Sequence, residues 1–271
     1  MGSRNWENVL IQNAVFRMRK IFLILVICVN SAFASAQDNS ELLVKAKQLR
    51  ADSKFDEALS AFELLLKNDS SNVEYLHNTA YLLCKVGNRK KEDSERQKYF
   101  HEAEYLSKKA ISLDINNAEA HYNYALALGR ISENAGAKQK IANAKIIKTE
   151  AEAAIRLNPK HAGAYHILGR WHRTIAGFNS IEKIMINTLF GGVPEGGSYN
   201  KAIECFAKAI EIEPTYMLHQ YELALSYHER GSANDDVYAK AWLKRAISLP
   251  VKNEDDKITL EKCNELLKKL Q

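Results

Sequence analysis

Histidine is the side chain in this sequence with the widest chemistry, and eight histidines occur along the chain. Two histidines can hold a metal from one helix face when they are four residues apart, as in H-E-x-x-H, and no two have that spacing. The segment from Gly191 to Gly197 lacks the Gly-Lys-Ser/Thr ending of a phosphate-binding loop, so it predicts a hinge. No G-x-S-x-G nucleophile motif is present. We therefore expect no catalytic residues, no metal and no cofactor.

Cations interleaved with rings at helical spacing offer a different chemistry. Arginine and lysine donate charge-assisted hydrogen bonds to carboxylates, and aromatic rings add contact area. We predict a ligand groove for a protein or peptide partner, with an acidic partner as one option. The alternative is that these side chains face solvent or pack between helices. The predicted groove residues are Lys47, His77, Tyr81, Tyr122, Arg130, His166, Arg170, Arg173 and Tyr221.

An apolar stretch within residues 177–199 offers a second kind of site. Its side chains are more apolar than one buried helix stripe requires. One interpretation is that they complete the core between neighbouring repeats. The other is that they form a lid over an apolar cavity able to hold an acyl chain, with the glycine-rich ends as hinges. The candidate lid residues are Ile181, Ile184, Met185, Leu189 and Phe190.

Repeated helices are expected to position these side chains, because one short sequence motif recurs along the chain. An Ala-Ile pair, two residues, and then Asp-Ile, Asn-Pro or Glu-Pro occurs at residues 110–115, 154–159 and 209–214. Proline stops the preceding helix because it has no amide hydrogen to donate. Each copy of the motif therefore ends one helix and leads into the next. The first helices of five hairpins are expected to start near Asn39, Val73, Ala118, Ala162 and Met217.

The repeat resembles the tetratricopeptide unit. Ala202, Phe206, Ala209 and Pro214 match its alanine, aromatic, alanine and proline positions. The pattern predicts an all-α, right-handed superhelix of about five helical hairpins with a C-terminal capping helix over 258–270.

The repeat domain is expected to occupy residues 37–271, with three inserts. The inserts at about 88–99 and 131–140 are polar and predict longer second helices in their hairpins. The insert at 177–199 predicts the apolar stretch followed by a glycine-rich loop.

Residues 1–36 predict a secretory signal peptide, for which Met18 is an alternative start. Basic side chains up to Lys20 precede an apolar run at 21–29, and small residues at 34–36 suit a cleavage site. This run is too short to cross a bilayer core of about 30 Å comfortably. We expect an exported protein, periplasmic or secreted; the alternative is an N-terminal membrane anchor.

Charge excludes one class of partner. The chain has a formal net charge of +5, and residues 1–36 contain four of its Lys and Arg and one of its Glu. The remainder is nearly balanced and has no block of like charge. We therefore expect no nucleic-acid binding.

Three cysteines follow the N-terminal segment, at Cys84, Cys205 and Cys263. None belongs to a C-x-x-C pair, and each falls within a helical pattern. We interpret them as small, buried apolar side chains.

Several short sequence motifs from residue 161 onward resemble those of the regulator-of-microtubule-dynamics family of tetratricopeptide-repeat proteins. The Leu-Phe-Gly motif inside a long insert separates this family from other repeats. The matching motifs are His166-Ile167-Leu168-Gly169-Arg170-Trp171, Thr188-Leu189-Phe190-Gly191, Ser198-Tyr199 with Ala202, Phe206 and Ala209, Trp242-Leu243, Leu249-Pro250, and Asn253-Glu254-Asp255.

This resemblance implies a binding role rather than catalysis. Animal members are described as microtubule-associated, or as membrane-contact tethers whose repeat domain can carry phospholipid, and the family has no catalytic motif. The export signal of this sequence departs from that pattern. We predict a non-enzymatic scaffold for protein–protein interaction; the alternative is a lipid carrier whose cavity is covered by the 177–199 insert. Arg170→Glu with Arg173→Glu is expected to keep the fold and lose the partner.

Overall fold

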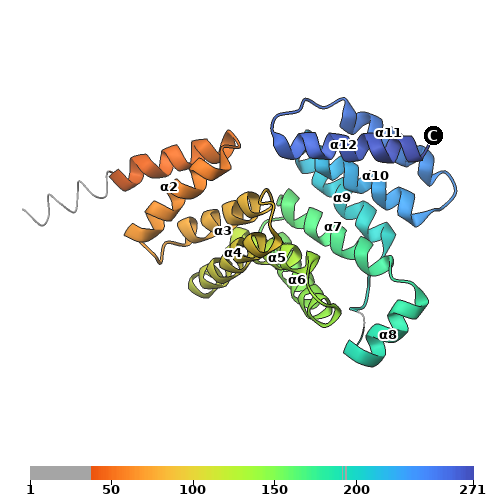
Figure 1. Cartoon of the computed structure of the whole chain (residues 1–271), viewed down its shortest axis with the longest axis horizontal. Helices are drawn as coiled ribbons and strands as arrows, with labels where there is room; N and C mark the ends of the chain where they lie inside the picture. The colour runs from red at the N-terminus through yellow and green to blue at the C-terminus, as the bar shows by residue number, and fades with distance from the viewer. Residues whose placement is uncertain (1–37, 191, 193) are drawn as a thin grey trace, which may run out of the picture. The chain divides into compact units, whose positions relative to one another are not determined.

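The computed structural model describes residues 38–190, 192 and 194–271, except for the side chain of Phe190. Every regular element in this range is an α-helix, which confirms the predicted all-α class (Figure 1). None of the helices described is both long enough and apolar enough to cross a membrane. The predicted signal peptide, residues 1–36, lies outside the described residues.

The chain divides near Leu65 into two compact units, and the first contains a pair of helices. A helix over residues 38–51 precedes α2 (Phe55–Asn68). Ala46 of the former and Phe62 of the latter are fully buried. Lys47, a predicted groove residue, is exposed on the first of these helices. It therefore belongs to the first unit, whereas the other predicted groove residues belong to the second.

The second unit contains four further hairpins and a final helix. Its pairs are α3 with α4, α5 with α6, α7 with α9, and α10 with α11, and α12 packs on α10 and α11. The first helix of each pair also contacts the first helix of the next pair. The bounds are α3 (Val73–Gly87), α4 (Asp93–Leu113), α5 (Ala118–Glu133), α6 (Ala137–Leu157), α7 (Ala162–Ala176), α8 (Ser180–Phe190), α9 (Tyr199–Ile212), α10 (Met217–Arg230), α11 (Asp235–Ile247) and α12 (Glu254–Lys269).

Side-chain caps explain where three of the first helices begin. The Asn72 side chain accepts a hydrogen bond from the Tyr75 amide, and Asn117 caps α5 in the same way. His161 Nδ1 accepts from the Ala164 amide at the start of α7. Each cap satisfies an amide that the first helical turn leaves without an intrahelical acceptor. The predicted starts at Val73, Ala118, Ala162 and Met217 are the observed ones.

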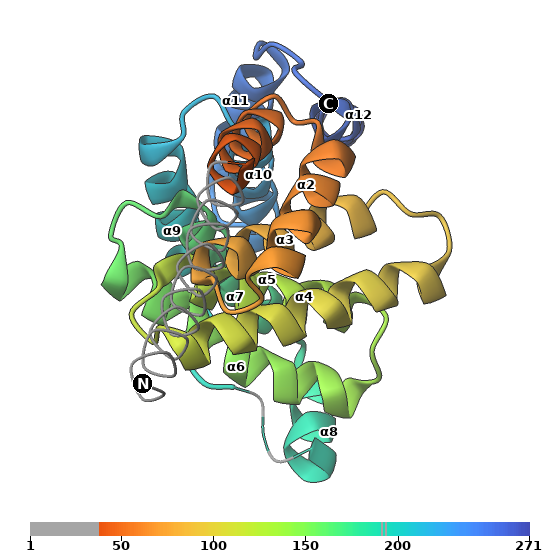
Figure 2. The same cartoon turned by 90° about the vertical axis from the view of Figure 1, so that its left-hand side faces the viewer.

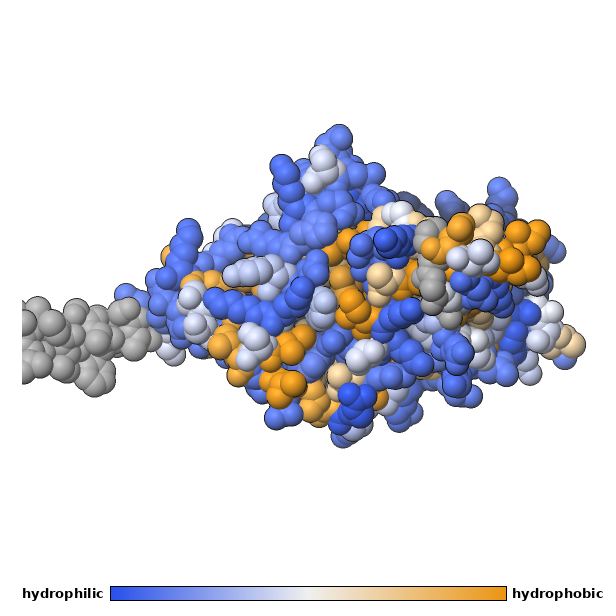
Figure 3. All heavy atoms as spheres, turned by 90° about the horizontal axis from the view of Figure 1, so that it is seen from below, coloured by the Kyte–Doolittle hydropathy of each residue, from blue (hydrophilic) through white to orange (hydrophobic). Residues whose placement is uncertain are grey.

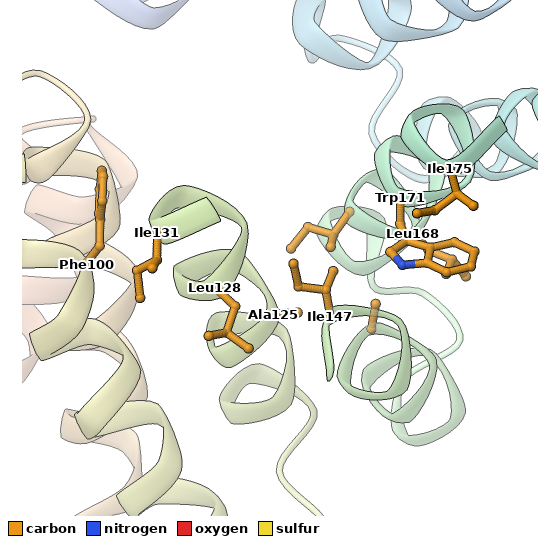
Figure 4. Packing of buried hydrophobic residues seen from close by; sticks show 10 residues of the cluster. Phe100, Ala125, Leu128, Ile131, Ile147, Leu168, Trp171 and Ile175 are labelled. Atoms are coloured by element: carbon orange, nitrogen blue, oxygen red, sulfur yellow. The ribbon is translucent and has the colours of Figure 1, made fainter. Parts of the chain in front are cut away.

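The core of the second unit runs across helices instead of surrounding one centre. Phe100 of α4, Leu128 of α5, Ile147 of α6 and Trp171 of α7 belong to one buried cluster, seen from close by in Figure 4. A small residue is required where α7 meets α9, because a Cβ at Gly169 would lie 2.9 Å from the Phe206 ring. Apolar burial that continues from one hairpin to the next is what holds a repeat array together.

The polar inserts at 88–99 and 131–140 fall at the beginnings of the second helices. α4 and α6 each have 21 residues, against 14 in α9. Both long helices start within or close to the predicted inserts, at Asp93 and Ala137. The extra residues therefore extend these hairpins without changing their pairing.

The 177–199 insert forms a separate helix, α8, which packs on α6 and lies at the lower edge of the views in Figures 1 and 2. Ile186 is buried, but Ile181, Ile184, Met185 and Leu189 are 72%, 65%, 53% and 63% exposed. In Figure 3, hydrophobic residues gather on the right-hand part of the molecule, on the side where α8 lies. The interpretation that they complete the core between repeats is therefore wrong, because α7 packs directly on α9 and leaves α8 outside.

The three described cysteines are free, and Cys84 and Cys263 are buried. Burial raises the pKa of each thiol to about 12. The thiolate form is therefore scarce near neutral pH, which agrees with the packing role predicted for them.

Candidate functional site: the inner face of the second unit

The first helices of the hairpins bring most predicted groove residues near one another, and we call this set of residues the inner face. It comprises Tyr81 on α3, Tyr122 and Arg130 on α5, and His166, Arg170 and Arg173 on α7. Burial is the largest cause of the high pKa of Tyr122, and the nearby Tyr81 raises that pKa further. His77 lies half-buried on α3.

Tyr221 lies on α10, near Arg173 and Glu222. It packs against the apolar cluster formed by α10, α11 and α12. Burial is the largest cause of its raised pKa. Its main contribution is therefore to the C-terminal core.

Arg173 is held between two carboxylates of α10. Its guanidinium donates to Glu222 Oε2 at 2.6 Å and to Glu229 Oε1 at 2.8 Å. Burial opposes the charge of Arg173, but Glu222 and Glu229 outweigh it and raise the pKa. The Arg170 Nε atom lies 3.7 Å from Glu222, and the Arg170 side chain is 44% exposed. Of the two arginines, Arg170 therefore has the greater access to a ligand.

Arg130 is also paired within the protein. It donates to Glu133 Oε1 at 2.8 Å, and the other oxygen of Glu133 lies 3.1 Å from Arg96. Burial works against the charge of Arg130, and Glu133 is the main cause that raises its pKa. The inner face thus has its cations largely neutralised by neighbouring carboxylates, which weakens the expected attraction for an acidic ligand.

A further ion pair joins the first and last helices of the second unit. Asp255 of α12 accepts from Lys85 at 2.5 Å and from Arg89 at 3.3 Å, both from the α3 side. Burial alone would raise the pKa of Asp255, but Lys85 and Arg89 lower it. Sequence reasoning did not identify Glu222 as the partner of Arg173 or Asp255 as the partner of Lys85. For Glu222, the sequence signal was a glutamate at a position of α10 that the helical pattern places in the interior, which indicates a buried partner.

His166 is buried against a histidine from α10. Its Nδ1 atom lies 2.8 Å from His219 Nδ1, so one ring donates and the other accepts. Burial, the neighbouring His219 and Arg170 lower the pKa of His166 well below its usual value. Within the described residues, no group of three His, Cys, Asp or Glu is arranged to hold a metal ion. His166 therefore contributes a neutral, buried ring to the inner face.

An apolar cavity of about 360 Å³ lies between α5, α6 and α7. Its wall includes Ile141, Ile147 and Trp171, and the Trp171 indole donates to the Ala144 carbonyl at 2.7 Å. Charged side chains also line it: Arg130, Glu133, Lys140 and Arg170. Ile147, Leu168 and Trp171 gather between α6 and α7 in Figure 4.

The candidate lid residues do not line this cavity. Ile181, Ile184, Met185 and Leu189 are exposed on α8, and the side chain of Phe190 lies outside the described residues. Phe178 is the residue of the 177–199 insert that contributes to the wall. Among the described residues of the insert, only the first part, at Phe178, therefore borders the cavity.

Comparison with known proteins supports both the fold and the family. The sequence model described as "Regulator of microtubule dynamics protein 1-3" matches residues 42–271. The bovine regulator of microtubule dynamics protein 1 is 32% identical over 177 residues, which are 65% of this chain and 55% of the relative. The mouse regulator of microtubule dynamics protein 2 is 29% identical over 234 residues, covering 85% of this chain and 56% of the relative. The chain thus spans little more than half the length of these relatives.

Among solved structures, the tetratricopeptide-repeat protein TTC0263 of Thermus thermophilus is similar, with a TM-score of 0.62 and 18% identity. The match covers 84% of this chain and 99% of that protein. This likeness confirms the predicted tetratricopeptide-type fold. From the match over residues 42–271, the chain belongs to the regulator of microtubule dynamics protein 1-3 family.

Proposed function

We propose that the chain is a non-enzymatic scaffold that binds a protein or peptide partner on the inner face of its second unit. The observation that carries this proposal is the combination of half-buried Tyr81 and Tyr122 with Arg170, whose side chain is 44% exposed. Rings that are already ordered lose little entropy when they bind, and arginine adds directional hydrogen bonds. The names of the relatives include microtubule dynamics, and a partner within that system is one candidate.

A charge reversal at Arg170 tests this proposal. Arg170→Glu should keep the fold, because Arg170 is only distantly paired with Glu222, and should abolish the recovery of partners. Arg173→Glu is unsuitable because it would place a third carboxylate against Glu222 and Glu229. The measurement is proximity labelling in the native cell, followed by binding of the enriched proteins to the purified chain.

Arg156→Glu is the matched control, since Arg156 is exposed on α6 outside the inner face. Equal recovery of every partner by the Arg170 variant and the wild-type chain would contradict the inner-face assignment. Loss of the same partners in the Arg156 variant would indicate a general charge effect instead.

The cavity supports a second function, the binding of an amphiphile such as a phospholipid acyl chain. Its volume of about 360 Å³ and apolar wall suit a hydrocarbon chain, and Arg130 and Arg170 at the polar part of the lining suit an anionic headgroup. This proposal uses the cavity between α5, α6 and α7 and does not require α8 as a lid.

Gly129 allows a sharp test, because it lines the cavity and a Cβ built there meets no atom within 4 Å. Gly129→Leu should fill the space without a clash, whereas Gly129→Ala should leave most of it open. Native mass spectrometry should show co-purified lipid on the wild-type and alanine proteins and none on the leucine protein. An empty wild-type protein, or equal lipid on all three, would refute the carrier function.

A further inference from the structure

The exposed side of α8 is an apolar surface of the second unit. Ile181, Ile184, Met185 and Leu189 are each more than half exposed, while Ile186 anchors the helix by being buried. Their spacing of three, four and eight residues places them on one side of the helix. Four large apolar side chains exposed together on one short insert indicate a contact with something outside the chain.

The surroundings of α8 are basic. α8 packs on α6, whose residues 137–149 contain four lysines and no Asp or Glu. Lys138, Lys140 and Lys145 are exposed, and the Lys148 Nζ atom lies 3.9 Å from the Cβ position at Gly196 in the same insert. Within α8, Glu182 and Lys183 offset each other. The helix on which α8 packs therefore carries net positive charge over residues 137–149, and of its four lysines Lys148 also lies 4.0 Å from Glu152.

We propose that α8 docks on the surface of a bilayer that contains anionic lipids. Ile181, Ile184, Met185 and Leu189 enter the boundary between headgroups and acyl chains, and the α6 lysines bind the headgroups. An amphipathic helix of 11 residues is too short to span a bilayer and suits the interface plane. This surface uses none of the inner-face residues, and it shares only Lys140 with the lining of the cavity.

The lysines of α6 favour a membrane over the other occupants of such a patch. A second copy of the chain, placed symmetrically, would bring the α6 lysines of both copies together and create like-charge repulsion. Anionic headgroups instead provide a field of opposite charge beside an apolar layer, so both features of the patch are satisfied at once.

Vesicle flotation with the full chain tests the proposal. The wild-type chain should bind vesicles of phosphatidylcholine mixed with phosphatidylserine more tightly than vesicles of phosphatidylcholine alone. Ile184→Asp with Met185→Asp should weaken binding to the mixed vesicles on the order of 100-fold, because two apolar side chains no longer leave water. The control is Ile115→Asp with Val237→Asp, which makes the same charge change at residues that are 70% and 64% exposed elsewhere.

The lysines are tested in parallel. Lys138→Gln with Lys145→Gln should weaken binding on the order of 30-fold, since two lysines near an anionic surface contribute about 2 kcal/mol together. Lys262→Gln with Lys268→Gln removes two exposed lysines from α12 and should change binding less. Equal effects of the two lysine pairs would overturn the proposed role of α6.

Fluorescence quenching at single positions tests whether α8 itself enters the bilayer. With brominated lipids in the vesicles, Ile184→Trp should gain fluorescence quenching, and Ile115→Trp should not. Absence of added quenching at position 184 would overturn the proposal even if the chain floats. Light scattering provides a further decision: a wild-type dimer that the α8 aspartates convert to a monomer would assign the patch to a second copy and also overturn it.

Discussion

The inner face and the exposed side of α8 differ in which side chains they bury and which they leave in solvent. On the inner face, buried charges are paired within the protein, as with Arg173 between Glu222 and Glu229. On α8, large apolar side chains are left in water, with Ile181 72% exposed. Paired charges contribute to the fold itself, because removing one leaves another desolvated. Exposed apolar side chains contribute little to the fold and are available for association.

Breaking the buried pair should therefore have the largest effect on stability. Glu222→Ala leaves Arg173 with one remaining carboxylate and Arg170 with no contact to Glu222, and we expect a loss of about 3 kcal/mol in the free energy of unfolding. Urea denaturation monitored by circular dichroism measures it. Glu211→Ala, which removes the exposed pair with Lys208, should cost much less, because solvent screens exposed ion pairs. Similar losses in the two variants would refute the contrast between buried and exposed charge.

Lowering the pH should have the next largest effect on the free energy of unfolding, through His166. The pKa of His166 is lowered in the folded protein, so below about pH 6.5 the unfolded chain binds a proton that the native chain does not. Stability is then complete above that pH and falls as the pH decreases, by up to about 1.4 kcal/mol per pH unit for one proton.

Denaturation at a series of pH values between 7 and 5 measures this slope. The His166→Asn variant should show a smaller slope than the wild-type protein. The comparison with His101→Asn is the control, because His101 is exposed on α4. An unchanged slope in the His166 variant would show that His166 does not cause the pH dependence of stability.

Substitution on α8 should have the smallest effect on stability. Ile184→Asp with Met185→Asp alters two exposed side chains, and we expect a change within about 0.5 kcal/mol in the free energy of unfolding. The same denaturation experiment applies. Ile186→Asp is the informative counterpart, since Ile186 is buried and its substitution should destabilise the protein. A large loss from the exposed pair would mean that α8 is part of the folding core.

The repeats were predictable from sequence because their signals are local. Asn72 and Asn117 cap the helices that follow them, so α3 and α5 begin at the expected residues. The groove was predictable only as a set of positions. Tyr122 and Arg170 do lie on the inner face, whereas Tyr221 packs into the C-terminal core and Lys47 lies in the other unit. Helical spacing places a side chain on one side of its own helix and carries no information on which later helix packs there.

The all-α repeat class, the starts of α3, α5, α7 and α10, and the family could be read from the residues alone, because each depends on residue types at short, regular spacing. Tertiary structure decided the ionisation and accessibility of the side chains. Arg173 pairs with Glu222, which is 49 residues away in the sequence, and Asp255 pairs with Lys85, which is 170 residues away. α8 stays outside the core because α7 packs directly on α9. Charge pairing and burial depend on distances in space, which the order of residues along the chain does not specify.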